Sequence, residues 1–280
     1  MKIIDARVFV PYGTMRTESK FFDVPFRYEM AQRKYNLPMA LSAIEASMDR
    51  LLQEMDEAGI VKAFTPALFG MDGKMENSEM AEFLSKYGDR FEGFAVAYPH
   101  HEDAVEEIER YVVNGPCRGV VVEPGWGECP MPINDRRVYP IYEYCEAHDI
   151  PMMLGFGGRL NPSLKMFKGE YLDEVLHDFP KLRACAVHGG WPYADDMCWL
   201  ALMHENFYVM PDVYMCGTPF SDQYMKAANT VVKDKIIFAS AYPIVSQKDC
   251  IQAYKDAGLR EDCYENVFYK NALRFLGENI

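Results

Sequence analysis

The stretch FPKLRACAVHGGWP, residues 179–192, contains the pattern from which the fold of the whole chain is predicted. Its apolar run LRACAVH (182–188) follows a helical segment that ends at Pro180, and His188 and two glycines close the run. A run that is apolar almost throughout is typical of a parallel strand covered on both faces. The stretch therefore predicts a buried strand with a polar residue at its C-terminal end.

The same pattern recurs along the chain. The other apolar runs are KIIDARVFV (2–10), VKAFTPA (61–67), FEGFAVAYP (91–99), RGVVVEP (118–124), PMMLGF (151–156), FYVMPDV (207–213) and DKIIFASAYP (234–243). Segments with helical periodicity lie between them, including 41–60, 103–115, 139–149 and 171–180. Eight strand–helix units in about 250 residues predict an α/β fold, a (β/α)8 TIM barrel, as a single domain over residues 1–280. The alternative, a doubly wound sheet, lacks a Gly-x-Gly-x-x-Gly turn after the first strand.

One connection is unusually long. Residues 11–38 follow the first strand and carry Arg16, Arg27 and Arg33. Loops of this length in a compact domain are usually functional, which predicts a lid-like or binding role.

Composition narrows the class of protein. Hydrophobic residues make up 49% of the 280 residues and the formal net charge is -13, which argues against nucleic acid because phosphate binding needs a basic face. No run approaches the ~20 apolar residues that span a bilayer, so no membrane association is expected. The eight cysteines contain no C-x-x-C pair, and no signal-like segment stands at the N-terminus. Both features favour a cytoplasmic location.

Polar residues close several of the apolar runs. In a TIM barrel the reacting groups lie at these C-terminal strand ends. The strand ends offer, in chain order, Arg7 and Phe9, Pro66, Tyr98 and His100, Glu123, Gly155, His188, Asp212, and finally Ser240, Ala241 and Tyr242. A candidate site is therefore expected at one end of the barrel.

Several segments together resemble the amidohydrolase superfamily. They are IIDARVF (3–9), AHDIPMMLGFGG (147–158), FPKLRACAVHGGWP (179–192), IIFASAYP (236–243) and ENVFYKNALRFLG (265–277). The chain is similar to the amidohydrolase-2 branch, which includes aminocarboxymuconate semialdehyde decarboxylase and the resorcylate-type decarboxylases. This resemblance implies a small carboxylated or hydroxylated ring compound as substrate, and a homodimer.

The chain departs from this family at the metal site. The resemblance places metal ligands at positions 7, 9, 155 and 241, but these residues are Arg7, Phe9, Gly155 and Ala241. Only the histidine of the sixth strand, His188, is kept. A divalent site needs three or four converging N or O ligands, so no metal and no other cofactor is expected.

The remaining polar residues suggest roles. His188 is the candidate general acid–base, and Arg7 is the candidate clamp for an anionic group, helped by Tyr242 and Glu123. The alternative for Arg7 is an internal ion pair with Glu123 or Asp212. The candidates for substrate binding are Trp191, Trp126, Asp212, Phe9 and Arg27.

Three functional hypotheses follow. The first is a metal-independent enzyme that cleaves an anionic ring compound by lactone hydrolysis, decarboxylation or another C–C or C–O cleavage. The second is a non-catalytic ligand-binding protein or partner subunit. The third is a metalloenzyme whose rebuilt site uses His188, Glu123, Asp212 or His100. The concentration of Arg, His, Glu, Asp, Tyr and Trp at the strand ends favours the first.

Overall fold

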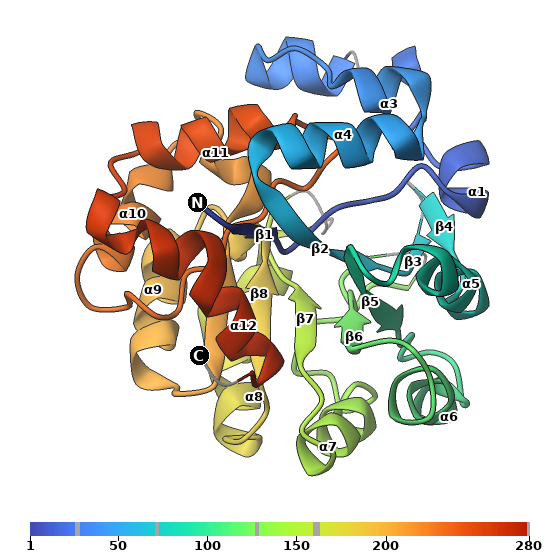
Figure 1. Ribbon diagram of the computed structural model, residues 1–280. Coiled ribbons are helices and arrows are strands. Elements are labelled where there is room, and N and C mark those ends of the chain that lie inside the picture. The colour runs from blue at the N-terminus through green and yellow to red at the C-terminus, as the bar shows by residue number, and fades with distance from the viewer. Residues whose placement is uncertain (26–28, 71–72, 127–128, 159–162, 279–280) are drawn as a thin grey trace.

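Seven parallel strands form one curled sheet, and helices lie around it (Figure 1). The computed structural model describes residues 1–25, 29–70, 73–126, 129–158 and 163–278. In sheet order the strands are β1 (Ile3–Asp5), β2 (Ile60–Pro66), β5 (Phe91–Val96), β6 (Gly119–Val122), β7 (Met152–Gly155), β8 (Ala184–Val187) and β9 (Phe207–Met210). A short antiparallel hairpin, β3 (Leu68–Gly70) and β4 (Gly73–Met75), follows β2. The predicted parallel α/β architecture is confirmed, with seven regular strands.

The eighth predicted strand, 234–243, is not a regular strand, although it lies between the two edges of the sheet. The Val209 and Ile237 amides link it to β9, and the Ala6 amide donates to the Phe238 carbonyl on the β1 side. The ladder is interrupted at Ser240, whose amide donates to the carboxylate of Asp5 instead of to a backbone carbonyl. A buried side chain has taken over a backbone donor, so sheet pairing here reduces to isolated bridges.

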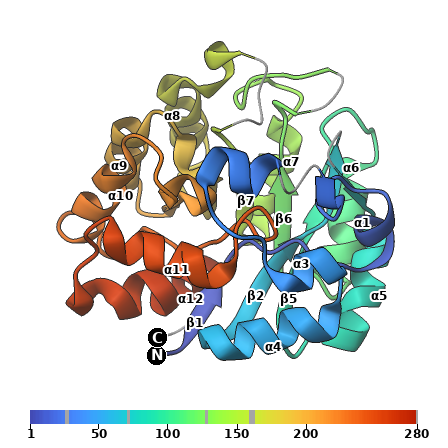
Figure 2. The ribbon, with the colours of Figure 1, turned by 90° about the horizontal axis from the view of Figure 1, so that it is seen from above.

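Helices alternate with the strands, and Figure 2 shows them surrounding the strands when the molecule is seen from above. The α-helices are α1 (Gly13–Thr17), α3 (Leu41–Glu45), α4 (Met48–Ala58), α5 (Asn77–Tyr87), α6 (Ala104–Ile108), α7 (Tyr139–Ala147), α8 (Gly169–Asp178), α9 (Ala194–Met203), α10 (Ser221–Ala228), α11 (Gln247–Asp256) and α12 (Asn271–Leu276). Helical turns of other types are η1 (Glu29–Lys34), η2 (Glu109–Val113), η3 (Leu164–Phe167), η4 (His188–Gly190), η5 (Asp212–Met215), η6 (Glu261–Cys263) and η7 (Asn266–Lys270).

The segment 41–60, predicted as one helix, is two helices. Ala46 adopts a left-handed conformation (φ 46°), and the Ser47 side chain then accepts the Arg50 amide as the N-cap of α4. Gly59, with φ 76°, ends α4. The break turns α3 away from the axis of α4, and Ile44 of α3 is exposed.

Two hydrophobic clusters form the core. The larger lies between the sheet and the helices. The smaller contains inward-facing residues of every strand of the main sheet, such as Phe64, Phe94 and Val121, and also Ile237 and Ala239 of the irregular eighth segment. Phe275 of α12 stacks on Phe94, with 6.1 Å between ring centroids. The curled sheet therefore encloses a packed interior.

The long connection 11–38 contains α1 and η1, so it is not a structureless loop. Thr14 ties α1 to α5 through a 2.6 Å hydrogen bond to Glu79. Arg16 and Arg33 are exposed, and Arg27 lies outside the described residues. None of the helices in the described ranges is long and apolar enough to cross a membrane.

Candidate active site

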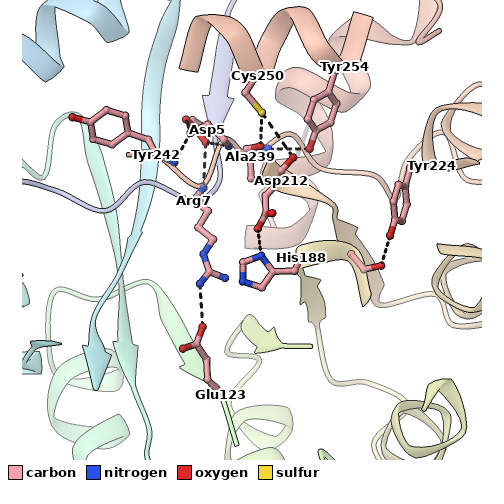
Figure 3. Close-up of polar contacts among 12 residues, drawn as sticks. Asp5, Arg7, Glu123, His188, Asp212, Tyr224, Ala239, Tyr242, Cys250 and Tyr254 are labelled. Carbon is pink, nitrogen blue, oxygen red and sulfur yellow. Dashed lines mark hydrogen bonds and ion pairs between the residues drawn. The ribbon is translucent and has the colours of Figure 1, made fainter. Parts of the chain in front are cut away.

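Four predicted residues stand directly after strands, at the same end of the parallel sheet. Arg7 follows β1, Glu123 follows β6, His188 follows β8 and Asp212 lies just beyond β9. In Figure 3 the guanidinium of Arg7 and the imidazole of His188 point toward one another. The carboxyl ends of these strands therefore bring two cationic or proton-carrying groups and two carboxylates to one place, as predicted.

Arg7 and Glu123 form a buried ion pair. Nη2 of Arg7 lies 3.1 Å from Oε1 of Glu123, and the two side chains are only 3% and 9% exposed. Among the described residues, Nε and Nη1 of Arg7 have no hydrogen-bond partner, although both are buried. The Arg7 guanidinium lies 5.2 Å from the centre of the Phe9 ring. Glu123 therefore balances the charge of Arg7 and leaves most of its donors unused.

His188 and Asp212 form a second buried pair. Nδ1 of His188 is 2.8 Å from Oδ2 of Asp212, and the Asp212 side chain is fully buried. The two atoms are close enough for an ion pair, but they do not form a hydrogen bond. The other imidazole nitrogen, Nε2, is buried and has no partner in the described parts of the chain. The carboxylate beside Nδ1 holds the imidazole ring in a fixed orientation, with Nε2 on the side away from Asp212.

The backbone is strained at this end of the sheet. His188, Asp212 and Ala241 have positive φ angles of 62°, 44° and 54°. Residues with a Cβ rarely adopt this conformation, and such strain gathers at functional sites. At His188 and Asp212 the strained residues are the two that form the buried pair. This coincidence favours a functional role for the pair over a packing role.

Asp5 is an important residue that the sequence analysis missed. It is fully buried, and its carboxylate accepts four hydrogen bonds, from the Arg7 amide, the Ser240 amide, Ser240 Oγ and Gln247 Nε2. Burial raises the pKa of Asp5 to about 6, although the hydrogen bonds from Ser240 and Gln247 oppose the shift. Asp5 lies two residues before Arg7 in the sequence. Its hydrogen bonds to Ser240 anchor the end of β1 to the irregular eighth segment. An acid inside an apolar run was the available signal, because such a group must find donors.

Tyr242 is not brought together with Arg7 and His188. Its hydroxyl lies 2.7 Å from Oγ of Ser42, which in turn donates to the carboxylate of Glu54. Figure 3 shows the Tyr242 ring pointing away from Arg7 and His188. The structure therefore places this phenol on the α3–α4 side of the chain, where it links the eighth segment to α3.

The aromatic candidates have different positions. Trp191 stacks on Tyr214, with centroids 4.9 Å apart, and Tyr214 meets His188 edge-on at 5.5 Å. Phe9 is buried and stacks on Phe21 at 4.2 Å. Trp126 lies close against Gly70, where a Cβ would be 2.3 Å from its Nε1. Trp191 and Phe9 thus adjoin the His188 and Arg7 pairs, whereas Trp126 packs against the β3–β4 hairpin.

The residues present do not fit the divalent metal that the resemblance implies. Arg7 is a cation at a ligand position, Phe9 and Ala241 offer no donor, and a Cβ at Gly155 would lie 2.5 Å from Cγ of Glu123. Glu123 therefore fills the space that a ligand side chain at 155 needs. His100 contacts the Cys129 carbonyl oxygen (2.8 Å) and does not join the others. In the described parts of the chain, three groups that could share a metal occur together only at Asp173, His177 and His204.

Comparisons with known proteins agree with this architecture. Among solved structures, an uncharacterised TIM-barrel protein from Bordetella bronchiseptica is 28% identical, with a TM-score of 0.92 and 99% of each chain covered. A 2,6-dihydroxybenzoate decarboxylase from Rhizobium has 16% identity and a TM-score of 0.72, again covering 99% of each chain. A probable 2-pyrone-4,6-dicarboxylic acid hydrolase from Acinetobacter baumannii has 15% identity and a TM-score of 0.65, covering 99% of this chain and 100% of that one.

No curated protein matches the chain in sequence. A family model described as "Amidohydrolase" matches residues 4–277, which is nearly the whole chain. The match includes all four strand ends that carry Arg7, Glu123, His188 and Asp212. The chain therefore belongs to the amidohydrolase-2 family.

Proposed function

We propose that the protein is a metal-independent hydrolase that opens a small, carboxylated ring ester. One observation supports this most directly: Nε and Nη1 of Arg7 and Nε2 of His188 are buried at the same strand ends, and none has a hydrogen-bond partner in the described chain. Leaving such polar atoms unpaired costs about 1–3 kcal/mol each, and more for a charged group. An anionic group that accepts from Arg7, together with a water molecule that donates to Nε2 of His188, would remove that cost.

Arg7 is the proposed anion clamp. A guanidinium has five N–H donors in a planar fork that matches a carboxylate, and Glu123 uses only Nη2. Burial strengthens the pairing because little water competes. Glu123 also fixes the orientation of the guanidinium, so the unused donors face a defined direction. The charge of the pair is balanced before the ligand arrives, which limits the cost of keeping Arg7 buried.

His188 is the proposed proton carrier. Its Nε2 would take a proton from water as the water oxygen bonds to the ring carbonyl carbon. It would then return that proton to the ring oxygen as the C–O bond breaks. Asp212 would stabilise the imidazolium between these two steps without being protonated itself. Water is added across one bond and no other reactant is required.

The position of Arg7 favours hydrolysis over loss of the bound carboxylate. In a decarboxylation the carboxylate becomes neutral CO2, so a guanidinium that grips it stabilises the starting state more than the transition state. A carboxylate held by Arg7 is therefore better suited to positioning the substrate than to leaving as CO2. Decarboxylation remains the second candidate for a ring with another carboxylate, because His188 could protonate the ring carbon.

The surrounding side chains favour a flat ring. Phe9 lies under Arg7, and the stacked pair of Trp191 and Tyr214 adjoins His188. Aromatic faces pack well on planar unsaturated rings. Solved structures of the same fold are described as acting on 2,6-dihydroxybenzoate and as a probable hydrolase of 2-pyrone-4,6-dicarboxylic acid. Both compounds are carboxylated rings of the proposed size.

The test uses these two compounds as probes. Purified protein treated with a chelator is mixed with 2-pyrone-4,6-dicarboxylic acid or 2,6-dihydroxybenzoate, and binding is measured by calorimetry and turnover by loss of ring absorbance. We expect binding that requires Arg7, and turnover of the pyrone that requires His188. Binding without turnover on either probe would instead favour a ligand-binding protein. If neither probe binds or reacts, or if Arg7→Ala leaves binding unchanged, the proposal is wrong.

We also propose that the protein is a homodimer, on the basis of the family resemblance. Light scattering at micromolar concentration should report twice the mass of one chain. A mass equal to a single chain would contradict this.

A further inference from the structure

Three potential metal ligands meet on the side of the molecule opposite the candidate active site. Asp173 and His177 lie one turn apart on α8, and His204 directly follows α9. The C-terminal ends of these helices precede β8 and β9, so His177 and His204 lie beside the start of those strands. The candidate active site follows the strands, which places the cluster at the other end of the barrel.

The distances in the cluster suit a tetrahedral metal. Oδ1 of Asp173 lies 2.9 Å from Nε2 of His204 and 3.3 Å from Nδ1 of His177. Zinc ligands at about 2.0–2.2 Å in a tetrahedron are separated by about 3.3 Å. All three ligand atoms lie within 4.8 Å of one another, so a small rotation of one ring would complete the geometry. The His177 side chain is 69% exposed and has room for that rotation.

One hydrogen bond would be exchanged. Nδ1 of His177 now lies 3.0 Å from the backbone carbonyl oxygen of Asp173. Coordination through Nδ1 would replace this contact and move the ring proton to Nε2, which solvent can accommodate. His204 has less freedom, because its side chain is mostly buried and already faces Asp173. It is therefore the fixed ligand of the group.

The surroundings are negatively charged. A groove of about 580 Å³ between α8 and α9 is lined by Gly169, Glu170, Asp173, Asp195, Asp196, Trp199 and Leu200. Burial raises the pKa of Asp196, and the nearby charges of Asp195 and Glu170 add to the shift. Carboxylates gathered along one groove raise the local concentration of cations. Asp173 belongs to both the groove and the ligand cluster, so the negative charge along the groove extends to the two histidines.

We propose that Asp173, His177 and His204 bind one Zn²⁺ ion, which ties α8 to the segment between α9 and β9. Two imidazoles and one carboxylate are ligands that zinc prefers, and water would fill the fourth position. The ion would stabilise the fold, because a ligand that binds only the folded chain raises its stability. It would take no part in chemistry at Arg7 and His188.

Isothermal titration of chelator-treated full-length protein with ZnCl2, together with thermal unfolding with and without ZnCl2, tests the proposal. We expect one Zn²⁺ per chain and a higher unfolding temperature with zinc. His177→Ala and Asp173→Asn should each weaken zinc binding by roughly 10–100-fold or more, since even partners outside the ligand shell have effects of that size. His177→Ala is the decisive variant because its side chain is exposed, and its unfolding temperature without zinc confirms that it folds.

His148→Ala is the matched control. His148 also lies at a helix end, with Nδ1 2.9 Å from the carbonyl oxygen four residues earlier, but it does not belong to the cluster. It should bind zinc as the unaltered protein does, and so should His188→Asn. The proposal is overturned if the unaltered protein binds no zinc, or if zinc binding survives in His177→Ala. It is equally overturned if His148→Ala loses as much affinity as His177→Ala.

Discussion

Arg7 and Glu123 connect β1 to β6, two strands that are separated by β2 and β5 in the sheet order. The 3.1 Å contact therefore spans the mouth of the curled sheet instead of joining neighbouring strands. Removing either partner would leave the other charge buried. The energetic consequences differ between the two partners, because only the guanidinium is also a proposed ligand-binding group.

Glu123→Gln should lower stability and at the same time tighten the binding of an anion. The amide keeps an acceptor for Nη2, but the charge of Arg7 is no longer balanced, and breaking a buried pair costs on the order of 3–5 kcal/mol. An anionic ligand would then supply the missing negative charge. Thermal unfolding with and without 2-pyrone-4,6-dicarboxylic acid measures both effects. The prediction is contradicted if the ligand raises the unfolding temperature of Glu123→Gln by no more than it raises that of the unaltered protein.

Arg7→Ala should mainly weaken ligand binding, and Arg7→Lys should restore charge but not affinity. Lysine offers a point charge in place of a planar fork, so the parallel N–H donors are lost. Calorimetric titration with the pyrone probe gives the affinities of the folded variants. Full affinity in Arg7→Lys would show that charge alone is sufficient and that the fork geometry is irrelevant.

His188→Asn should reduce turnover by roughly 10²–10⁴-fold while ligand binding is largely kept. Asp212→Asn should reduce turnover with little effect on binding, because Asp212 acts through the imidazole and not on the ligand. Steady-state kinetics separate kcat from KM for each variant. A folded His188→Asn protein with full turnover would exclude the proposed role of this histidine.

Asp5→Asn should destabilise the fold and alter its pH dependence. The amide has one acceptor oxygen for donors that now use two, which costs about 1–3 kcal/mol. In the unaltered protein the pKa of Asp5 is raised from 3.8 to about 6. Its contribution to stability is therefore greatest below pH 4 and is lost as pH rises through 6, by on the order of 2–3 kcal/mol.

Chemical denaturation of both proteins at several pH values between about 4 and 7 isolates this contribution. The stability difference between the unaltered protein and Asp5→Asn should shrink as pH rises. Other carboxyl groups titrate in both proteins and cancel in the difference. A difference that is constant over this range would show that Asp5 does not titrate there.

Chelation should leave turnover unchanged, although it should lower the unfolding temperature if zinc occupies the cluster at α8 and α9. The ligand positions that the family resemblance implies hold Arg7, Phe9 and Gly155, and the proposed reaction therefore uses no metal. Elemental analysis combined with activity assays checks this. Metal content that falls in His188→Asn but not in His177→Ala would place a metal at the active site and restore the hypothesis of a rebuilt site.

Much of the fold was predictable because strand interiors are marked by apolar runs and strand ends by polar residues. That rule places Arg7, Glu123, His188 and Asp212 at one end of the sheet. The sequence leaves two carboxylate partners open for Arg7, Glu123 and Asp212, and the structure pairs it with Glu123. The apolar pattern does not indicate the pairing of His188 with Asp212, because both residues have positive φ angles that the pattern does not encode.

Other features were beyond sequence reasoning for specific reasons. The eighth strand reads as regular in sequence, but a side chain 235 positions away takes the Ser240 amide. The position of Tyr242 depends on α3, whose direction is set by the break at Ala46. The Asp5 carboxylate takes the Ser240 amide without changing the order of apolar and polar residues. The break at Ala46 also leaves that order unchanged. The apolar pattern therefore reveals neither feature.

The close approach of Glu123 to Gly155 has a consequence for how this protein can evolve. A histidine at 155 would collide with Glu123, where even a Cβ would lie 2.5 Å from Cγ. A smaller residue at 123 would make room but would leave the Arg7 guanidinium without its counter-ion. Replacing Arg7 or Glu123 alone leaves a buried charge without its counter-ion, and a histidine at 155 alone collides with Glu123, so each of these three changes is unfavourable by itself. The ion pair therefore couples positions 7, 123 and 155, so that the residue tolerated at one of them depends on the other two.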